Sequence, residues 1–392
     1  MNLVQKAIAV VALICFAHLS YSQAHKKFHL KSLVVDTHND ILTECFDKHL
    51  SFDDNLLGKT HSDIARFKQG GVDAQIFSIW CDGEMKQPFN YANTQIDTLF
   101  ATLKRNPSTI ALVTSSIELK KAVKDKKLAA MIGVEGGHMI QDDLDKLDSL
   151  YKRGVRYMTL TWNNSTPWAT SAMFETTDST NAPKGLNDFG KQVVKRMNAL
   201  GMMIDISHVG EKTFYDVIAA TTRPVIASHS SAYALAPVFR NLKDDQISTV
   251  AKNGGVIHVN FYSGFLDSNF STKDHAFQVK HKVERDSLLL RNPEPHFANA
   301  ALFKKYANEV EDMKAPLSLL IDHIDHIVKI AGIDHVGIGS DFDGINSTPK
   351  ELFDVTTYPL VTEALLQRGY SKKDVRKILG LNFLRVLMAN EK

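Results

Sequence analysis

Several features that would mark a particular class of protein are missing from this sequence. Its 46 basic and 44 acidic residues leave a formal net charge of only +2, and no basic cluster with interleaved aromatic residues is present. This balance argues against a nucleic-acid-binding protein. No Gly-x-Gly-x-x-Gly turn follows an early strand, which disfavours a dinucleotide-binding doubly wound sheet. Low-complexity tracts and repeats of fixed period are absent, and the composition is that of an ordinary globular enzyme.

Long apolar runs are missing as well. The run at residues 7–17 is shorter than the roughly 20 residues that a membrane span needs. It follows Lys6 and is followed by Ser20 and Ser22, small residues at the −3 and −1 positions of a cleavage site, so we expect a signal peptide over residues 1–22. The mature protein, residues 23–392, is then expected to be secreted or periplasmic. The chain ends without a hydrophobic tail, and we expect no membrane anchor.

Cysteine is scarce. Only Cys45 and Cys81 lie beyond residue 22. An oxidising compartment permits a bridge between them, but the sequence does not give their distance, and a disulfide stays an open question.

Short apolar runs typical of buried strands alternate with longer segments of helical period. Two of these segments predict helices at Asn187 to Leu200 and at Leu317 to Ile330. The alternation predicts one TIM-like (β/α)8 barrel over residues 23–392, with a charged helical insertion at about 268–315 before the last strand. We expect this insertion to be a solvated cover without chemistry. The eight predicted strands are Leu33–Val35, Ala74–Trp80, Ala129–Val134, Tyr157–Thr161, Met202–Ile206, Val225–Ala227, Gly255–Asn260 and His335–Gly339.

Histidines and carboxylates follow five of these strands, where a barrel collects its chemistry. The fifth and sixth strands lead into His208 and His229. The first leads into His38 and Asp40, which the two-residue period of extended chain puts on one side. Glu135 follows the third strand and Asp341 the eighth.

This set is larger than one catalytic zinc needs, because such a zinc takes three protein ligands and keeps one position open. Two zinc ions per chain that share a bridging carboxylate, Glu135, account for the surplus. The alternative, that several of these residues are hydrogen-bonded turn residues, is weaker for the whole set than for any single member.

Six motifs together resemble the membrane dipeptidase (renal dipeptidase) family of zinc peptidases. They cover nearly all of the mature chain in the family's order: Asp-Thr-His-Asn-Asp at 36–40, Gly-Val-Glu-Gly-Gly-His at 133–138, Asp-Ile-Ser-His-Val at 205–209, Ser-His-Ser-Ser-Ala-Tyr at 228–233, Arg240-Asn241 and Gly-Ser-Asp-Phe-Asp-Gly at 339–344.

The resemblance implies a TIM-like barrel with a binuclear zinc centre that hydrolyses dipeptides, including some with a D residue at the C-terminus. It implies His38 and Asp40 on one zinc, His208 and His229 on the other, and Glu135 between them. It also implies substrate contacts from Arg240 and Asp341.

The chemistry of these two side chains agrees with those roles. The guanidinium of Arg240 suits a substrate carboxylate, and the alternative is a surface ion pair with Asp244 or Asp245. Asp341 can take a proton from the attacking water and pass it to the leaving amine.

The chain departs from the family pattern at two positions. The vertebrate enzymes have a histidine that contacts substrate after the fourth strand, where this chain has Trp162, and a cysteine near the position of Asn164 that pairs with the equivalent of Cys81. Trp162 and Tyr262 are further candidates for substrate contact. Alternatives to a dipeptidase are a hydrolase of another small amide or lactone and a non-catalytic metal-loaded binding protein. A homodimer is an open alternative to a monomer.

Overall fold

Eight parallel strands form a nearly closed barrel in the computed structural model, which describes residues 23–291 and 295–392. Their order around the barrel is β1-β2-β4-β5-β6-β7-β8-β9, and the short β3 pairs with β4 outside this path. A parallel bridge between Asn39 and Phe342 links the first strand to the segment after the last. The strands are β1 (Val35–Asn39), β2 (Ala74–Trp80), β3 (Ile110–Leu112), β4 (Leu128–Glu135), β5 (Val155–Thr159), β6 (Met203–Asp205), β7 (Ile226–Ala227), β8 (Val256–Val259) and β9 (Val336–Ile338).

The predicted TIM-like barrel is confirmed, and each of the eight predicted strands overlaps a strand of the barrel. The prediction for the first strand was wrong in its bounds, because β1 begins at Val35 and continues to Asn39. His38 therefore lies inside a strand whose residues are all buried. The additional strand β3 was not predicted.

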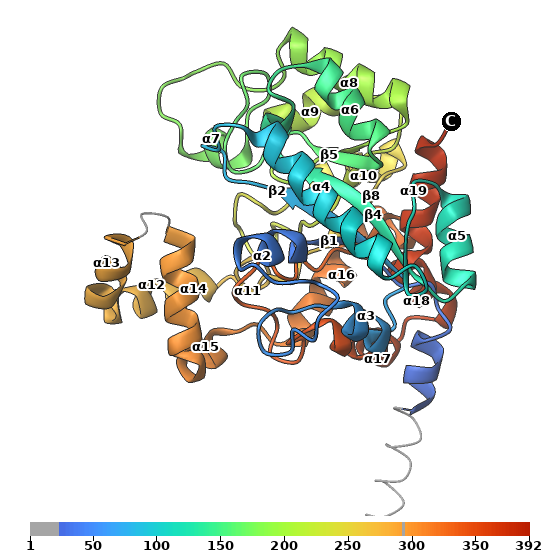
Figure 1. Cartoon of the computed structure of the whole chain (residues 1–392). Coiled ribbons are helices and arrows are strands. Elements are labelled where there is room, and N and C mark those ends of the chain that lie inside the picture. Colours follow the sequence, from blue (N-terminus) through green and yellow to red (C-terminus); the bar gives the residue numbers. More distant parts are fainter. Residues whose placement is uncertain (1–22, 292–294) are drawn as a thin grey trace, which may run out of the picture.

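Helices surround the barrel (Figure 1). The helix predicted at 187–200 is confirmed by α8. The side chain of Asn187 caps its start by accepting hydrogen bonds from the backbone N–H groups of Phe189 and Gly190, and Gly201, with φ +82°, ends it. The prediction at 317–330 is confirmed by α16. These helices are α2 (Ile41–Asp47), α3 (Ile64–Gly70), α4 (Pro88–Arg105), α5 (Ser116–Lys124), α6 (Leu144–Lys152), α7 (Ala172–Thr177), α8 (Asp188–Leu200), α9 (Glu211–Ala220), α10 (Asp244–Asn253), α11 (Ser263–Leu266), α16 (Leu317–Ala331), α17 (Tyr358–Arg368), α18 (Lys372–Arg376) and α19 (Asn382–Asn390).

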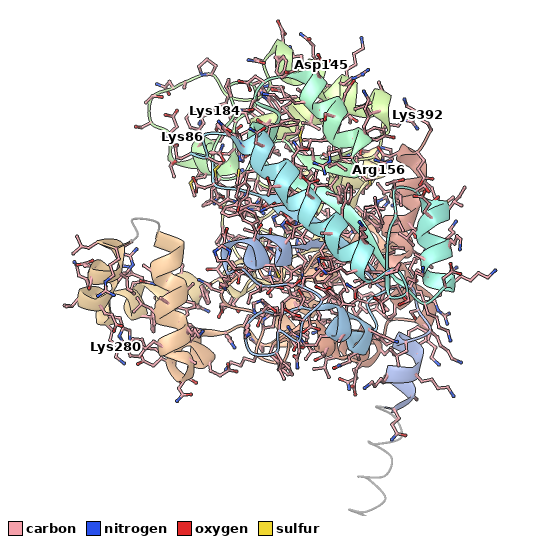
Figure 2. All side chains as sticks on the ribbon, in the orientation of Figure 1. Lys86, Asp145, Arg156, Lys184, Lys280 and Lys392 are labelled. Carbon is pink, nitrogen blue, oxygen red and sulfur yellow. The ribbon has the colours of Figure 1, made fainter. Side chains whose placement is uncertain are left out.

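Four further helices between β8 and β9 stand to one side of the barrel (Figure 1). They are α12 (Phe270–Lys280), α13 (Lys282–Leu289), α14 (Pro295–Lys305) and α15 (Ala307–Met313). They occupy the part of the chain for which the sequence predicts an insertion. Phe277, Leu302 and Phe303 belong to a small apolar cluster of their own, while Lys280 lies at the edge of this group (Figure 2).

An apolar cluster lies at the amino-terminal part of the barrel strands. It joins residues such as Val35, Met131 and Met203 with Phe383 of α19. The histidines and carboxylates that the sequence singles out lie at the opposite, carboxyl ends of the strands. This cluster therefore fills the barrel interior beneath them with apolar side chains. Within the described residues no helix is both long and apolar enough to cross a membrane. The predicted signal peptide, residues 1–22, lies outside the described residues.

Candidate metal centre

Six polar side chains meet at the carboxyl ends of β1, β4, β6, β7 and β9. All are buried, although all are ionisable. They are the six residues that the sequence singles out at the strand ends: His38, Asp40, Glu135, His208, His229 and Asp341.

The carboxylate of Glu135 lies between the three histidines. Its Oε1 is 2.8 Å from Nε2 of His208 and 3.4 Å from Nε2 of His229. Its Oε2 is 3.4 Å from Nε2 of His38. The same nitrogen of His38 is 3.4 Å from Oδ2 of Asp40 and 3.9 Å from Oδ1 of Asp341. The two oxygens of one carboxylate thus face two different groups of ligands.

Hydrogen bonds at Nδ1 decide which nitrogen of each histidine can bind a metal. Nδ1 of His38 is 2.9 Å from the Tyr157 hydroxyl, which donates its own proton to the carbonyl oxygen of Thr37 and must therefore accept from His38. Nδ1 of His208 donates to Oδ1 of Asn163 at 3.2 Å. When the proton is on Nδ1, the lone pair of Nε2 points into the site, as in metal-bound histidine.

The arrangement fits a cation better than it fits an empty pocket. Nε2 of His208 lies 3.1 Å from Nε2 of His229, and both face Oε1 of Glu135. Two imidazole lone pairs and a carboxylate oxygen this close repel one another unless positive charge lies between them. On the other side, Nε2 of His38 and Oδ1 of Asp40 are buried without a hydrogen-bond partner. Nitrogen and carboxylate ligands of this kind are those that zinc takes.

The pKa shifts agree with a site built for positive charge. Although burial acts against it, Tyr157 and the carboxylates of Asp40 and Glu135 raise the pKa of His38 well above its usual value, so the site favours a positive charge at this imidazole. Burial, helped by the charge of Arg240, lowers the pKa of His208 to about 4, and burial and the charge of His38 lower the pKa of His229 well below its usual value. Burial also acts against ionisation of Glu135, but His38, His208 and His229 hold the pKa of this carboxyl well below its usual range. The carboxylate and two neutral imidazoles are therefore ready to act as ligands.

Asp341 belongs to the same group of buried ionisable side chains. Burial raises the pKa of Asp341 to about 8; the charge of His38 opposes this shift, and the carboxylates of Asp40 and Glu135 add to it. Its Oδ2 accepts a hydrogen bond of 2.8 Å from the side-chain amide of Asn260. Both Asp341, with φ +62°, and His208, with φ +64°, adopt the left-handed backbone conformation that residues other than glycine seldom take.

Arg240 is buried, and one of its nitrogens donates to the carbonyl oxygen of His229 at 3.2 Å. The alternative of a surface ion pair is wrong, because Asp244 pairs with His326 and Asp245 accepts from the Tyr215 hydroxyl. Nε of Arg240 has no hydrogen-bond partner. Arg240 and His208 both line a cavity of about 320 Å³, to whose lining the other five side chains of the centre do not contribute.

The two aromatic candidates lie on different sides of this centre. The ring of Trp162 is 6.4 Å from that of His208 and 5.0 Å from that of Trp80, centroid to centroid. The backbone N–H of Tyr262 donates to Oδ1 of Asn260, and its ring packs against Phe270 of the insertion. Cys45 and Cys81 are both buried and free, so the open question of a disulfide is answered against one.

The sequence did not single out the residues behind the ligands. Tyr157, Asn163 and Asn260 bind His38, His208 and Asp341 in the way described above, and Ser228 lies 2.7 Å from Nδ1 of His229. A signal was available, since a polar side chain inside or just after an apolar strand needs a buried partner.

A barrel of this kind with histidines and carboxylates gathered at one end defines a metal-dependent hydrolase. Comparison with known families agrees with the geometry: the model of the membrane dipeptidase family, peptidase family M19, matches residues 22–392. The chain belongs to this family and is one of its metallopeptidases.

Solved structures show the same fold. The probable dipeptidase PvdM from Pseudomonas aeruginosa is 28% identical, with a TM-score of 0.76 over 95% of this chain and 98% of that one. The dipeptidase AC, an M19 metallopeptidase, is 24% identical, with a TM-score of 0.76 over 92% of this chain and 98% of that one. A metallopeptidase from Rhodobacter sphaeroides, solved with a phosphinate mimic of the dipeptide L-Ala-D-Ala, is 23% identical, with a TM-score of 0.75 over 92% and 100%.

Proposed function

We propose that this protein is a zinc-dependent dipeptidase that hydrolyses free dipeptides, including those with a D residue at the C-terminus. The observation that carries the proposal is the position of Glu135, whose two oxygens face His208 and His229 on one side and His38 on the other. His38 and Asp40 would hold one zinc ion, His208 and His229 the second, and Glu135 both. When bound, such a pair lowers the pKa of a water between the ions towards ~7 and polarises the scissile carbonyl.

The protein's own side chains bind the substrate and move the proton. Arg240 offers donors to the substrate carboxylate in a buried position, where a charge-assisted hydrogen bond is strong. Asp341 accepts the proton of the attacking water at Oδ1 and returns it to the leaving amine, while Asn260 holds Oδ2. Trp162 supplies an apolar wall beside His208, and Tyr262 closes the side next to Asn260.

A fixed carboxylate site also limits the length of the substrate. Arg240 is held next to His229, so we expect a substrate whose carboxylate binds there to be a dipeptide, and we expect tripeptides to be left intact. Secretion into an oxidising compartment, with free dipeptides as substrates, is the cellular setting that we propose for this reaction.

The test is one assay of the purified, zinc-loaded protein with a dipeptide, its N-acetyl derivative, its C-terminal amide and the tripeptide. The proposal expects rapid hydrolysis of the free dipeptide alone. Efficient hydrolysis of the amide or the tripeptide would indicate a different small-amide hydrolase. Absence of turnover on every dipeptide, with zinc bound, would indicate a metal-loaded binding protein.

A further inference from the structure

Asp205, the last residue of β6, is a buried carboxylate that the proposed reaction does not use. Its Oδ1 accepts the backbone N–H groups of Ser207 at 3.0 Å and Ser228 at 2.8 Å. Its Oδ2 accepts the hydroxyl groups of Thr159 at 2.5 Å and Ser228 at 2.6 Å. Since all of these neighbours donate, Asp205 acts only as an acceptor.

The hydrogen bond from Ser228 to Asp205 fixes the state of His229. Ser228 has one hydroxyl proton, and it goes to Asp205. Oγ of Ser228 can therefore only accept from Nδ1 of His229, 2.7 Å away, so the imidazole proton is on Nδ1 and the lone pair is on Nε2. Without this bond, Oε1 of Glu135, 3.4 Å from Nε2, would favour a proton on Nε2, which cannot bind a metal.

We propose that Asp205, acting through Ser228, is a positioning residue that keeps the Nδ1 proton on His229 and thereby sets the zinc affinity of the His208–His229 half of the centre. The inference rests on the proposed function only in taking zinc as the ion. The state of the His229 ring does not depend on which substrate is cut.

A second buried aspartate gives a matched control. Asp36 of β1 binds Ser340, which follows β9, in nearly the same geometry, with the backbone N–H of Ser340 at 2.9 Å on Oδ1 and its hydroxyl at 2.6 Å on Oδ2. Oδ1 of Asp36 also accepts the backbone N–H of His38 at 3.3 Å, a bond that an asparagine oxygen at the same position retains. Oγ of Ser340 then accepts the backbone N–H of Phe342 rather than an imidazole. Asp36→Asn therefore changes a similar buried network without changing the tautomer of a histidine.

Asp205→Asn should reverse the direction of two hydrogen bonds, the one between residue 205 and Ser228 and the one between Ser228 and His229. The backbone N–H groups of Ser207 and Ser228 can only donate, so the asparagine oxygen must stay at the position of Oδ1 and its NH₂ group must face Ser228. Ser228 then accepts from this NH₂ group and turns its own proton to Nδ1 of His229. The imidazole proton moves to Nε2, and the nitrogen that faces the metal becomes a donor.

The experiment measures zinc affinity by competition with a chromophoric chelator, and the ring state of His229 by ¹⁵N NMR of the metal-free protein with labelled histidine. We expect the proton on Nδ1 in the wild type and on Nε2 in Asp205→Asn. The weaker of the two zinc sites in Asp205→Asn should bind zinc about 10- to 100-fold less tightly than the weaker site of the wild type. This is the loss seen when residues that hydrogen-bond to a metal ligand are replaced. Asp36→Asn should retain the wild-type affinity.

A purely structural role predicts another order of effects. Asparagine keeps the backbone hydrogen bonds at Oδ1, so a structural role predicts a smaller loss of zinc affinity in Asp205→Asn than in Ser228→Ala. Our proposal predicts the larger loss of zinc affinity in Asp205→Asn. Wild-type zinc affinity in Asp205→Asn, or a proton on Nε2 in the wild type, would overturn the proposal. If Asp205→Asn does not fold, Ser228→Ala with undiminished zinc affinity overturns it equally. A wild type that binds zinc but cuts no dipeptide contradicts the proposed function alone.

Discussion

Replacement of Arg240 by lysine tests how the substrate is held. Arg240 is buried, donates to the carbonyl oxygen of His229 and keeps Nε free of any partner in the protein. Burial lowers the pKa of Arg240 to about 10, against the opposing effect of Glu135, Asp341 and Asp205, so the guanidinium remains charged at neutral pH. A lysine would keep a positive charge and lose the planar pair of donors.

The expected loss is that of one hydrogen bond to a charged group, about 1.5–3 kcal/mol, or roughly 10- to 150-fold in kcat/KM for a free dipeptide. The C-terminal amide of the same dipeptide has no carboxylate to bind, so its much lower kcat/KM should change little. The ratio of kcat/KM for the dipeptide to kcat/KM for its amide measures the free energy that the substrate carboxylate contributes. In the variant this free energy should be smaller by about 1.5–3 kcal/mol.

Steady-state kinetics of both substrates on the wild type and Arg240→Lys gives this difference directly. Arg385→Lys is a matched control, because Arg385 donates to backbone carbonyl groups of residues 254, 255 and 334, at the opposite end of the barrel. Equal losses for the dipeptide and its amide would refute a carboxylate site at Arg240, since they would indicate a general disturbance of the centre.

Three further predictions concern the pocket, the core and acid stability. Trp162→His should keep kcat within about tenfold, roughly 1.4 kcal/mol, and shift the ranking of dipeptides away from apolar N-terminal side chains, because an indole offers an apolar wall and no proton; an inert wild type that this change activates would contradict it. Gly133→Ala should lower the free energy of unfolding by about 1–3 kcal/mol and weaken zinc binding, since its methyl group would lie 2.1 Å from Cζ of Tyr157, which binds His38; an unchanged melting temperature would speak against this. Burial lowers the pKa values of His29 and His323 to about 4, so between pH 6.5 and 4 the unfolded chain binds more protons than the folded one. For each histidine, the free energy of unfolding should therefore fall by about 3 kcal/mol as the pH falls from 6.5 to 4. Denaturant titrations over this range should show a shallower decline of the free energy of unfolding in His29→Gln than in the wild type.

The sequence was sufficient for the parts of the molecule that repeat a simple pattern. Buried parallel strands such as β4 consist mainly of apolar residues. A polar side chain at the end of such a run is buried and needs a hydrogen-bond partner or a metal, which is why Glu135, His208 and His229 could be found. The strand β3 has three residues and one neighbour, too little for a pattern.

The hydrogen bonds behind the ligands could not be predicted in the same way. Tyr157 reads as one more apolar strand residue, yet its hydroxyl binds His38 across the barrel, 119 positions away in the chain. Asp205 and Ser228 stand in motifs that the sequence displays, but only the register of β6 beside β7 brings them together. Such contacts depend on the closed barrel, and no local pattern encodes them.

The count of metal ions tests the central claim most directly. Protein purified without chelators should contain close to two zinc ions per chain by elemental analysis, and Glu135→Gln should lower the occupancy of both sites, because this carboxylate faces both groups of ligands. One zinc per chain with full dipeptidase activity would contradict the account.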